Sequence, residues 1–303
     1  MSKNFLKKIY EKEYKLLLII PFALLLIALI SLGMFYVEND TFINKGISLK
    51  GGTSLTIISE VATEAEIISL LGYEGEINSR ALSGSGKQLG IIVEVDETDQ
   101  NEINGMIDKL NEKYNLGEND ITVETIGSSL GSSFFQETVK SMIIAFIFMG
   151  IVVFLYFRTI VPSLAVILAA VSDIFVTMAV VNTLGIKVGS AGIAAFLMLI
   201  GYSVDSDILL STKVIKRKDG TLDERIYSAM RTGLMMSLTT ITAVFIALIF
   251  SQSPVITQIM EILLIGLLID LVNTWIQNVG ILRWYMEAKK KWESLVYSKM
   301  LEL

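Results

Sequence analysis

The sequence predicts an α-helical polytopic membrane protein with a small α/β domain inserted after its first membrane span. Three observations support this fold class. Hydrophobic residues make up 52% of the 303 residues and charged residues only 18%, with a mean hydropathy of +0.61. Six apolar runs are long enough to cross a bilayer, which takes about 20 residues of helix. Residues 37–136 depart from this composition and carry six Lys and Arg against seventeen Asp and Glu.

The six apolar runs are predicted to be transmembrane helices. Pro162 falls in the first turn of its run, and Pro254 marks the turn before the last run, where a missing N–H costs little. We predict a cytoplasmic N-terminus with the first span over residues 1–36, an extracytoplasmic domain over 37–136, a five-span bundle over 137–284 and a cytoplasmic tail over 285–303. The predicted spans are Leu16–Tyr36, Val139–Phe157, Pro162–Leu184, Gly189–Thr212, Gly233–Ser251 and Val255–Trp284.

Residues 37–136 show the alternating apolar patterns of a small sheet with two helices. The order of these elements is βαββαβ, which predicts a ferredoxin-like α+β domain. Gly51 and Gly52 allow a bulge or a close backbone approach at the base of this domain. The expected elements are an extended run over Ile47–Ser59, a helix over Thr63–Leu71, strands over Glu76–Leu82 and Leu89–Val95, a helix over Asp99–Tyr114, a strand over Asp120–Ile126 and a short connecting helix over Leu130–Thr138.

The basic residues predict the orientation, because Lys and Arg are enriched in cytoplasmic loops. If the N-terminus is cytoplasmic, six spans return the C-terminus to the same side. The basic residues of both termini and of the 213–231 segment then lie inside. Apart from the large domain, the opposite side keeps only Lys140 and Lys187. The acidic domain is therefore predicted to lie outside the cytoplasm of a multi-pass cell-membrane protein.

Several function classes are disfavoured by composition. The chain has no Cys and no His, which removes disulfides, thiolate metal sites and the commonest proton switch near neutral pH. Ser83–Lys87 contains glycines and a lysine without the spacing of a phosphate-binding loop, so we interpret it as a hairpin turn. The first apolar run is too long for a cleavable signal. We expect no enzymatic activity, no cofactor or metal, and no nucleic-acid partner.

Four aspartates lie within the predicted spans: Asp173, Asp205, Asp207 and Asp270. A charge at such depth costs about 2.5–3.5 kcal/mol on insertion scales. Asp205 and Asp207 are about 200° apart around a helix, so both cannot face one groove. Arg231, at the inner mouth of the fifth span, is the only arginine that adjoins these groups in the predicted topology.

Each of these acids also has a structural interpretation. Asp207 could turn toward the inner interface and pair with Lys213 or another basic residue on the inner side, and Asp270 could form a buried hydrogen-bonded knot with Asn273 and Asn278. Asp173 could be structural in a similar way. Taken together, four acids without a basic residue near the midplane favour a proton or ion pathway, which is the usual role of intramembrane ionisable groups.

Four short motifs stand in order along the chain. They are SLKGGT at Ser48–Thr53, which includes Gly51, Gly52 and Thr53; Ser172-Asp173; GYSVDSDILL at Gly201–Leu210, which includes Gly201, Tyr202 and Ser203; and Arg231-Thr232 followed by Ser237, Thr239 and Thr240. Jointly they resemble the SecD/SecF family of protein-export membrane proteins, within the resistance-nodulation-division (RND) superfamily, and are closest to its archaeal SecF branch. Ser48 and Ser172 stand where the family usually has an acid and a histidine, and Ser206 matches an acid of bacterial members.

The resemblance implies an RND-type bundle that acts with SecD beside a SecYE-type channel and uses the proton gradient to move unfolded secretory polypeptides. Asp205 would gain and lose a proton, and Asp173 and Asp270 would relay it. Arg231 would stabilise the ionised form of the acid that it faces. Asp207 belongs to the same candidate pathway. Two other interpretations stay open: half of a proton-driven exporter of small molecules or lipids, or a passive scaffold that stabilises SecD and the channel.

Overall fold

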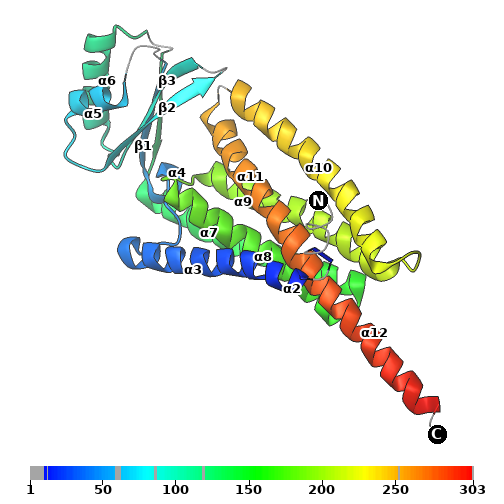
Figure 1. Ribbon diagram of the computed structural model, residues 1–303. Coiled ribbons are helices and arrows are strands. Elements are labelled where there is room, and N and C mark those ends of the chain that lie inside the picture. Colours follow the sequence, from blue (N-terminus) through cyan, green and yellow to red (C-terminus); the bar gives the residue numbers. More distant parts are fainter. Residues whose placement is uncertain are drawn as a thin grey trace.

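The computed structural model describes residues 10–11, 13–58, 63–84, 87–117, 120–251 and 253–301. Six helical segments within this part of the chain are long and apolar enough to cross a membrane, as predicted. A four-stranded sheet with two helices stands at one end of the helical bundle (Figure 1). The six segments are Tyr14–Asn39, Ser128–Phe157, Ile160–Thr183, Ser190–Lys216, Leu222–Phe250 and Pro254–Leu295.

The first segment consists of α2 (Tyr14–Leu17) and α3 (Ile19–Asn39), and the others are built from α7 to α12. The prediction of a separate connecting helix at Leu130–Thr138 is wrong, because these residues are the first part of one continuous helix and contain no proline to interrupt it. The remaining elements are α7 (Ser128–Phe157), α8 (Ile160–Thr183), α9 (Ser190–Ser211), the π-helix η1 (Thr212–Lys216), α10 (Leu222–Phe250), α11 (Pro254–Val272), the π-helix η2 (Asn273–Asn278) and α12 (Val279–Leu301).

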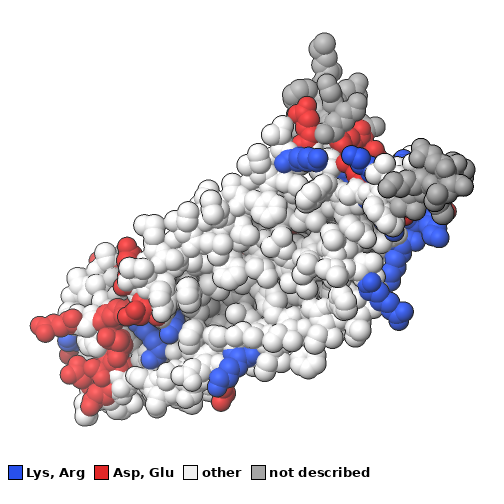
Figure 2. Space-filling view, turned by 90° about the horizontal axis from the view of Figure 1, so that it is seen from below, with Lys and Arg blue, Asp and Glu red and all other residues white. Residues whose placement is uncertain are grey.

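The charged side chains are distributed unevenly along the molecule. Figure 2 shows mainly acidic side chains at the end that holds the sheet, and most of the Lys and Arg side chains, together with some acidic ones, toward the opposite end. Between them lies a broad band with few charged side chains. An uncharged band of this kind is what the hydrocarbon core of a bilayer requires of the surface that faces it.

The sheet has the strand order β2-β3-β1-β4, and all neighbouring strands are antiparallel. Leu55 of β1 pairs with Val93 of β3 on one side and with Val123 of β4 on the other. The chain order of strands and helices is the predicted βαββαβ order. The elements are β1 (Gly52–Ile57), α5 (Glu64–Leu71), β2 (Ile77–Gly84), β3 (Lys87–Val95), α6 (Gln100–Tyr114) and β4 (Ile121–Ile126).

The start of the first strand differs from the prediction of one extended run from Ile47. Residues Ile47–Lys50 form the short helix α4, and β1 begins only at Gly52. Gly51 and Gly52 have φ angles of 93° and 126°, in the region that favours glycine. A Cβ on Gly51 would lie 2.5 Å from the Cα of Ser128. The predicted close backbone approach is therefore confirmed: it is the contact between this glycine pair and the start of α7.

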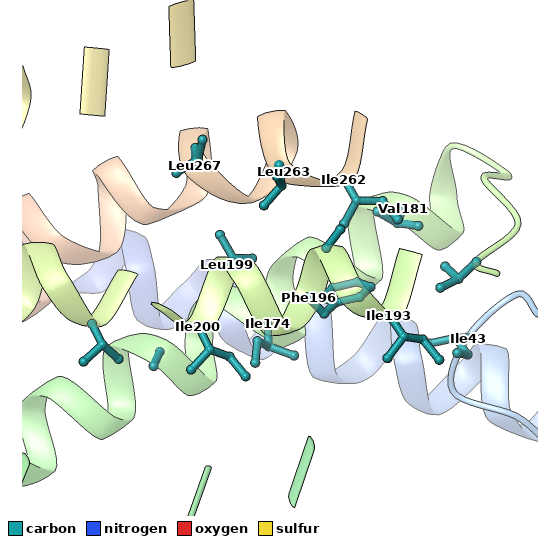
Figure 3. Close-up of a cluster of buried hydrophobic side chains, with 14 of the residues drawn as sticks. Ile43, Ile174, Val181, Ile193, Phe196, Leu199, Ile200, Ile262, Leu263 and Leu267 are labelled. Carbon is teal, nitrogen blue, oxygen red and sulfur yellow. The ribbon is translucent and has the colours of Figure 1, made fainter. Parts of the chain in front are cut away.

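The bundle and the α/β part each have their own hydrophobic core. In the bundle, Ile174 of α8, Leu199 of α9 and Leu263 of α11 belong to one buried cluster and point into the space between these helices (Figure 3). In the α/β part, α5 and α6 cover one face of the sheet (Figure 1). The buried residues of this second core are Leu55, Ile57, Ile67, Leu71, Ile91, Val93, Val95, Ile103, Met106 and Leu110.

The other face of the sheet meets the bundle through polar contacts. Lys187, in the loop between α8 and α9, lies 3.5 Å from Glu76 and 3.7 Å from Glu94 of the sheet domain. Lys50 of α4 forms a closer ion pair with Glu76, at 2.7 Å, and this contact lowers the pKa of the Glu76 carboxyl. A cavity of 380 Å³ lies between the sheet and the N-terminal ends of α9 and α11. The joint is therefore polar and incompletely filled, unlike the two cores.

Candidate functional site: a carboxyl cluster in the bundle

Three aspartates meet inside the bundle, one from each of its three central helices. Asp173 comes from α8, Asp207 from α9 and Asp270 from α11, and each is at most 1% exposed. In the apolar 18-residue stretches of the spans that contain α8 and α9, 61% and 56% of the residues are buried. The corresponding shares for the other spans are 6% to 33%. The aspartates therefore lie on the inward faces of the helices that are most enclosed.

Asp173 is held by two donors from neighbouring helices. The Ser203 hydroxyl of α9 donates to its Oδ2 at 2.5 Å, and the Asn273 amide of η2 donates to its Oδ1 at 2.8 Å. Asp270 lies beside Ser203 and the carboxyl group of Asp173. Two neighbouring buried carboxyl groups cannot both be ionised without a large cost in free energy.

Asp207 is joined to the same cluster through the π-helix η2. The Thr274 hydroxyl lies 3.1 Å from Asp207 Oδ1 and 3.0 Å from Asp270 Oδ1, and the Asn278 amide donates to Asp207 Oδ1 at 2.7 Å. A π-helix widens one turn of an α-helix and occurs frequently at functional sites. Here it presents Asn273, Thr274 and Asn278 to acids on three different helices.

The cluster has no basic partner among the residues that the structure describes. The buried Arg283 points elsewhere, since its Nη1 donates to Asp223 at 2.6 Å. No group of three or more acidic side chains among the described residues is arranged to hold a metal ion. Buried carboxylates without a cation are costly, and neighbouring ones cannot all be ionised. The arrangement is suited to holding and exchanging protons.

The structure separates the two aspartates of the fourth span, as their spacing predicts. Asp207 is fully buried, whereas Asp205 lies on the exposed side of α9 together with Gly201 and Tyr202. The alternative pairing of Asp207 with Lys213 is wrong, because the Lys213 ammonium donates to the Thr232 hydroxyl at 2.8 Å and to Ser228.

The predicted knot around Asp270 exists in altered form. Asn273 and Asn278 do lie in a buried hydrogen-bonded network, but they donate to Asp173 and Asp207 rather than to Asp270. Arg231 lies on the exposed side of α10 and forms no ion pair within the described part of the chain. Its predicted contact with an intramembrane acid is not made in this arrangement.

The SLKGGT motif lies at the joint between sheet and bundle, away from the carboxyl cluster. The backbone N–H of Ser190, at the start of α9, donates to the Ser48 hydroxyl at 2.9 Å. Thr53 is fully buried, and its hydroxyl donates to the Glu97 carbonyl at 2.6 Å. The motif therefore connects the foot of the sheet to the helix that carries Asp207.

Sequence reasoning missed one intramembrane acid, Glu261 of α11. It lines a cavity of 270 Å³ between the sheet and the helix ends nearest to it, together with Arg80 and Lys187. The signal was present, since Glu261 interrupts the last apolar run nine residues before Asp270. It lies about 180° around the helix from Asp270, so it does not belong to the same cluster.

The fold and the cluster define a multi-pass membrane protein with ionisable groups buried between its helices and an α/β domain at one end. Residues 106–288 match the family described as "Protein export membrane protein SecD/SecF, C-terminal". The chain belongs to this SecD/SecF family of protein-export membrane proteins.

Its relatives match it over almost their whole length. The chain is 39% identical to the protein-export membrane protein SecF of Methanocaldococcus jannaschii, over 92% of this chain and 99% of that protein. It is 38% identical to SecF of Pyrococcus furiosus, over 95% of this chain and 96% of that protein.

The fold is also that of a solved structure. SecDF, a translocon-associated membrane protein from Thermus thermophilus, superposes with a TM-score of 0.70 at 18% identity, over 90% of this chain. The chain spans only 38% of the length of that SecDF chain. The likeness establishes the fold of the bundle with its added α/β domain.

Proposed function

We propose that this chain is the SecF-type subunit of the Sec protein-export machinery and acts together with SecD. The similarity to archaeal SecF over more than nine-tenths of both chains supports this assignment. The chain spans only 38% of the SecDF chain that shares its fold, and SecD is the proposed partner. The further partners would be a SecYE-type channel and the unfolded polypeptide that leaves it.

The proposed orientation places both termini in the cytoplasm and the α/β domain outside. The separation of acidic and basic side chains between the two ends of the molecule supports it (Figure 2). In this orientation the sheet stands over the outer ends of α9 and α11, where it can contact a chain that has just crossed the membrane.

We propose that export is coupled to the proton gradient through the buried aspartates. The observation that carries this proposal is the clustering of Asp173, Asp207 and Asp270 inside the bundle, with no cation beside them among the described residues. Binding or release of one proton there changes the charge of a low-dielectric site, which changes the relative free energy of different helix arrangements. Export would follow from repeated changes of this kind.

Asp205 takes a different part in this proposal. It lies on the exposed side of α9, two residues from Asp207, so its carboxyl faces lipid or a second bundle. An exposed acid at this depth is costly in lipid, so we propose that SecD covers this face. Asp205 would then exchange a proton at the contact between the two subunits, with Arg231 of α10 available there when the bundles move.

The motion would reach the outside through the joint described above. Ser48 and Lys187 connect the foot of the sheet to the start of α9, which carries Asp207. A shift of α9 would therefore move the sheet relative to the membrane.

The test measures export and complex recovery on the same membranes, with and without an uncoupler. Asparagine preserves the shape of aspartate but carries no exchangeable carboxyl proton. We expect Asp207→Asn and Asp270→Asn to lower uncoupler-sensitive export while SecD still co-purifies. Asp108→Asn, at an exposed position of α6, is the matched control and should export like the parent.

Three results would contradict the proposals. Normal uncoupler-sensitive export by both buried variants would exclude the cluster from coupling. A loss of export in strict proportion to lost complex would favour a passive scaffold. If SecD and channel subunits are absent from the purified complex and a small molecule is transported instead, the assignment to protein export is wrong.

A further inference from the structure

The Thr274 hydroxyl lies between two acids that belong to different helices. Its Oγ1 is 3.1 Å from Asp207 Oδ1 on α9 and 3.0 Å from Asp270 Oδ1, one helical turn earlier in its own helix. All three side chains are at most 1% exposed. Threonines inside helices commonly donate to the backbone carbonyl four residues earlier. Thr274 instead contacts the carboxyl side chain four residues earlier and reaches a second helix.

One hydroxyl cannot donate to both carboxylates, because it carries a single proton and two lone pairs. When Thr274 donates to one acid, its contact with the other is favourable only if that acid carries a proton and donates it to Oγ1. Both contacts are therefore favourable when one of the two carboxyl groups is protonated and the other is ionised. Either Asp207 or Asp270 can be the protonated one. If both carboxyl groups were ionised at these distances, one of them would face a lone pair of Thr274 Oγ1.

We propose that the Thr274 hydroxyl is the bridge through which a proton passes between Asp207 and Asp270. This inference rests on the proposed proton coupling and names a route within it. In the transfer, the O–H bond of Asp207 breaks as its proton moves to Thr274 Oγ1. The original Thr274 proton moves at the same time to the Asp270 carboxylate. Asp207 ends ionised, Asp270 ends protonated and the hydroxyl is restored, so no other reactant is needed.

The bridge would complete a continuous route across three helices. From Asp270 the path would continue to the neighbouring carboxyl group of Asp173 on α8, which accepts a hydrogen bond from Ser203. Carboxyl and hydroxyl groups make up this path, and both kinds of group can accept and donate a proton. Without Thr274, Asp207 would keep only the Asn278 amide as a described side-chain partner, and an amide donor passes no proton on.

No charged side chain other than these acids faces the bridge within the described residues. The acids are Asp173 from α8, Asp207 from α9 and Asp270 from α11, and η2 contributes only neutral side chains. Two amide oxygens, those of Gln277 and Asn278, and Asp207 Oδ2 have no hydrogen-bond partner there.

The experiment compares Thr274→Ser with Thr274→Val in the intact complex recovered from membranes. Serine keeps the hydroxyl, whereas valine keeps the branched shape without it. We expect Thr274→Val to lower uncoupler-sensitive export at least about tenfold, in keeping with the size of proton-transfer contributions, and Thr274→Ser to stay within about twofold of the parent. Thr274→Ala serves in its place if the valine variant does not assemble.

Infrared spectroscopy of the purified protein gives a second readout. A protonated carboxyl that loses a hydrogen bond shows its C=O stretch at higher frequency. The carboxyl band should therefore shift in Thr274→Val, not in Thr274→Ser. In an Asp270→Asn background, where the bridge has lost its acceptor, Thr274→Val should lower export no further, which a general packing defect would not predict.

Parent-like export by Thr274→Val, or equal loss in the serine and valine variants, would overturn the bridge. These outcomes are distinguishable from failure of the proposed function. If Asp207→Asn and Asp270→Asn abolish uncoupler-sensitive export while Thr274→Val does not, the cluster couples export by another route. If the asparagine variants export normally, the coupling itself is wrong.

Discussion

The Ser203 hydroxyl of α9 lies 2.5 Å from Asp173 Oδ2 of α8, and this short contact joins two neighbouring helices in the interior of the bundle. Both side chains are at most 1% exposed. A buried polar contact of this kind resists separation of its helices, because each group would lose its partner in a site without water. Protonation of a carboxylate changes the strength of the hydrogen bond that it accepts.

The orientation can be tested with single cysteines, because the chain contains none of its own. Asn104 of α6 and Lys218 of the loop after η1 are both exposed. We expect a membrane-impermeant thiol reagent to label Asn104→Cys in intact cells and to label Lys218→Cys only after lysis. Labelling of position 218 alone in intact cells would reverse the proposed orientation.

The conformation of Gly52 predicts a large effect of substitution. Its φ of 126° disfavours any residue with a Cβ, and a Cβ there would collide with the Val95 carbonyl oxygen. We expect Gly52→Val to lower the thermal unfolding temperature of the purified protein, with backbone strain alone costing about 1–3 kcal/mol.

Gly105 of α6 is the matched control for this substitution. A Cβ there would meet nothing within 4 Å, so Gly105→Ala should stabilise the helix by about 0.5–1 kcal/mol. Equal unfolding temperatures for Gly52→Val and the parent would contradict the strained geometry at the base of the sheet.

Close packing between α9 and α11 depends on Gly266. A Cβ on this glycine would lie 2.7 Å from Leu199 Cδ1, and Leu199 is fully buried. Gly266→Ala should destabilise the bundle by about 1–3 kcal/mol through overpacking. Adding Leu199→Ala should cost less in this background than in the parent, because the extra methyl group occupies part of the vacated space. Strict additivity of the two effects in thermal unfolding would argue against this contact.

The ion pair between Lys50 and Glu76 predicts a pH dependence at the joint. Its hydrogen bond lowers the pKa of Glu76 below the ordinary value of 4.5. The pair therefore stabilises the folded state fully above pH 4.5, and this contribution is lost as the pH falls through the lowered pKa.

The size of this effect is small, since the Glu76 side chain is 59% exposed and water and salt screen the pair. We expect Glu76→Gln to unfold at a slightly lower temperature than the parent at neutral pH. The difference should shrink in high salt and vanish in acid. Glu112→Gln, at an exposed position of α6, should match the parent throughout, and a Glu76→Gln difference that grows in acid would contradict the assigned cause.

The sequence by itself determined the six spans, the inserted βαββαβ segment and the opposite charge of the two ends. These properties are set by local composition and periodicity, which can be read without knowing what packs where. The spacing of Asp205 and Asp207 also showed that only one could face a given groove. It could not show which one, because that depends on the rotation of α9 against its neighbours.

Only the tertiary structure decided that Asp207 is the buried one, since this follows from the packing of α9 against α11 and η2. Only the tertiary structure also showed that the backbone of Gly51, just after α4, lies in close contact with Ser128, 77 positions later in the chain. Thr274 owes its place between two acids to a π-helical turn that has no sequence signature here. Contacts between distant segments depend on how whole elements pack together. The sequence lists the residues, but it does not show which of them become neighbours in space.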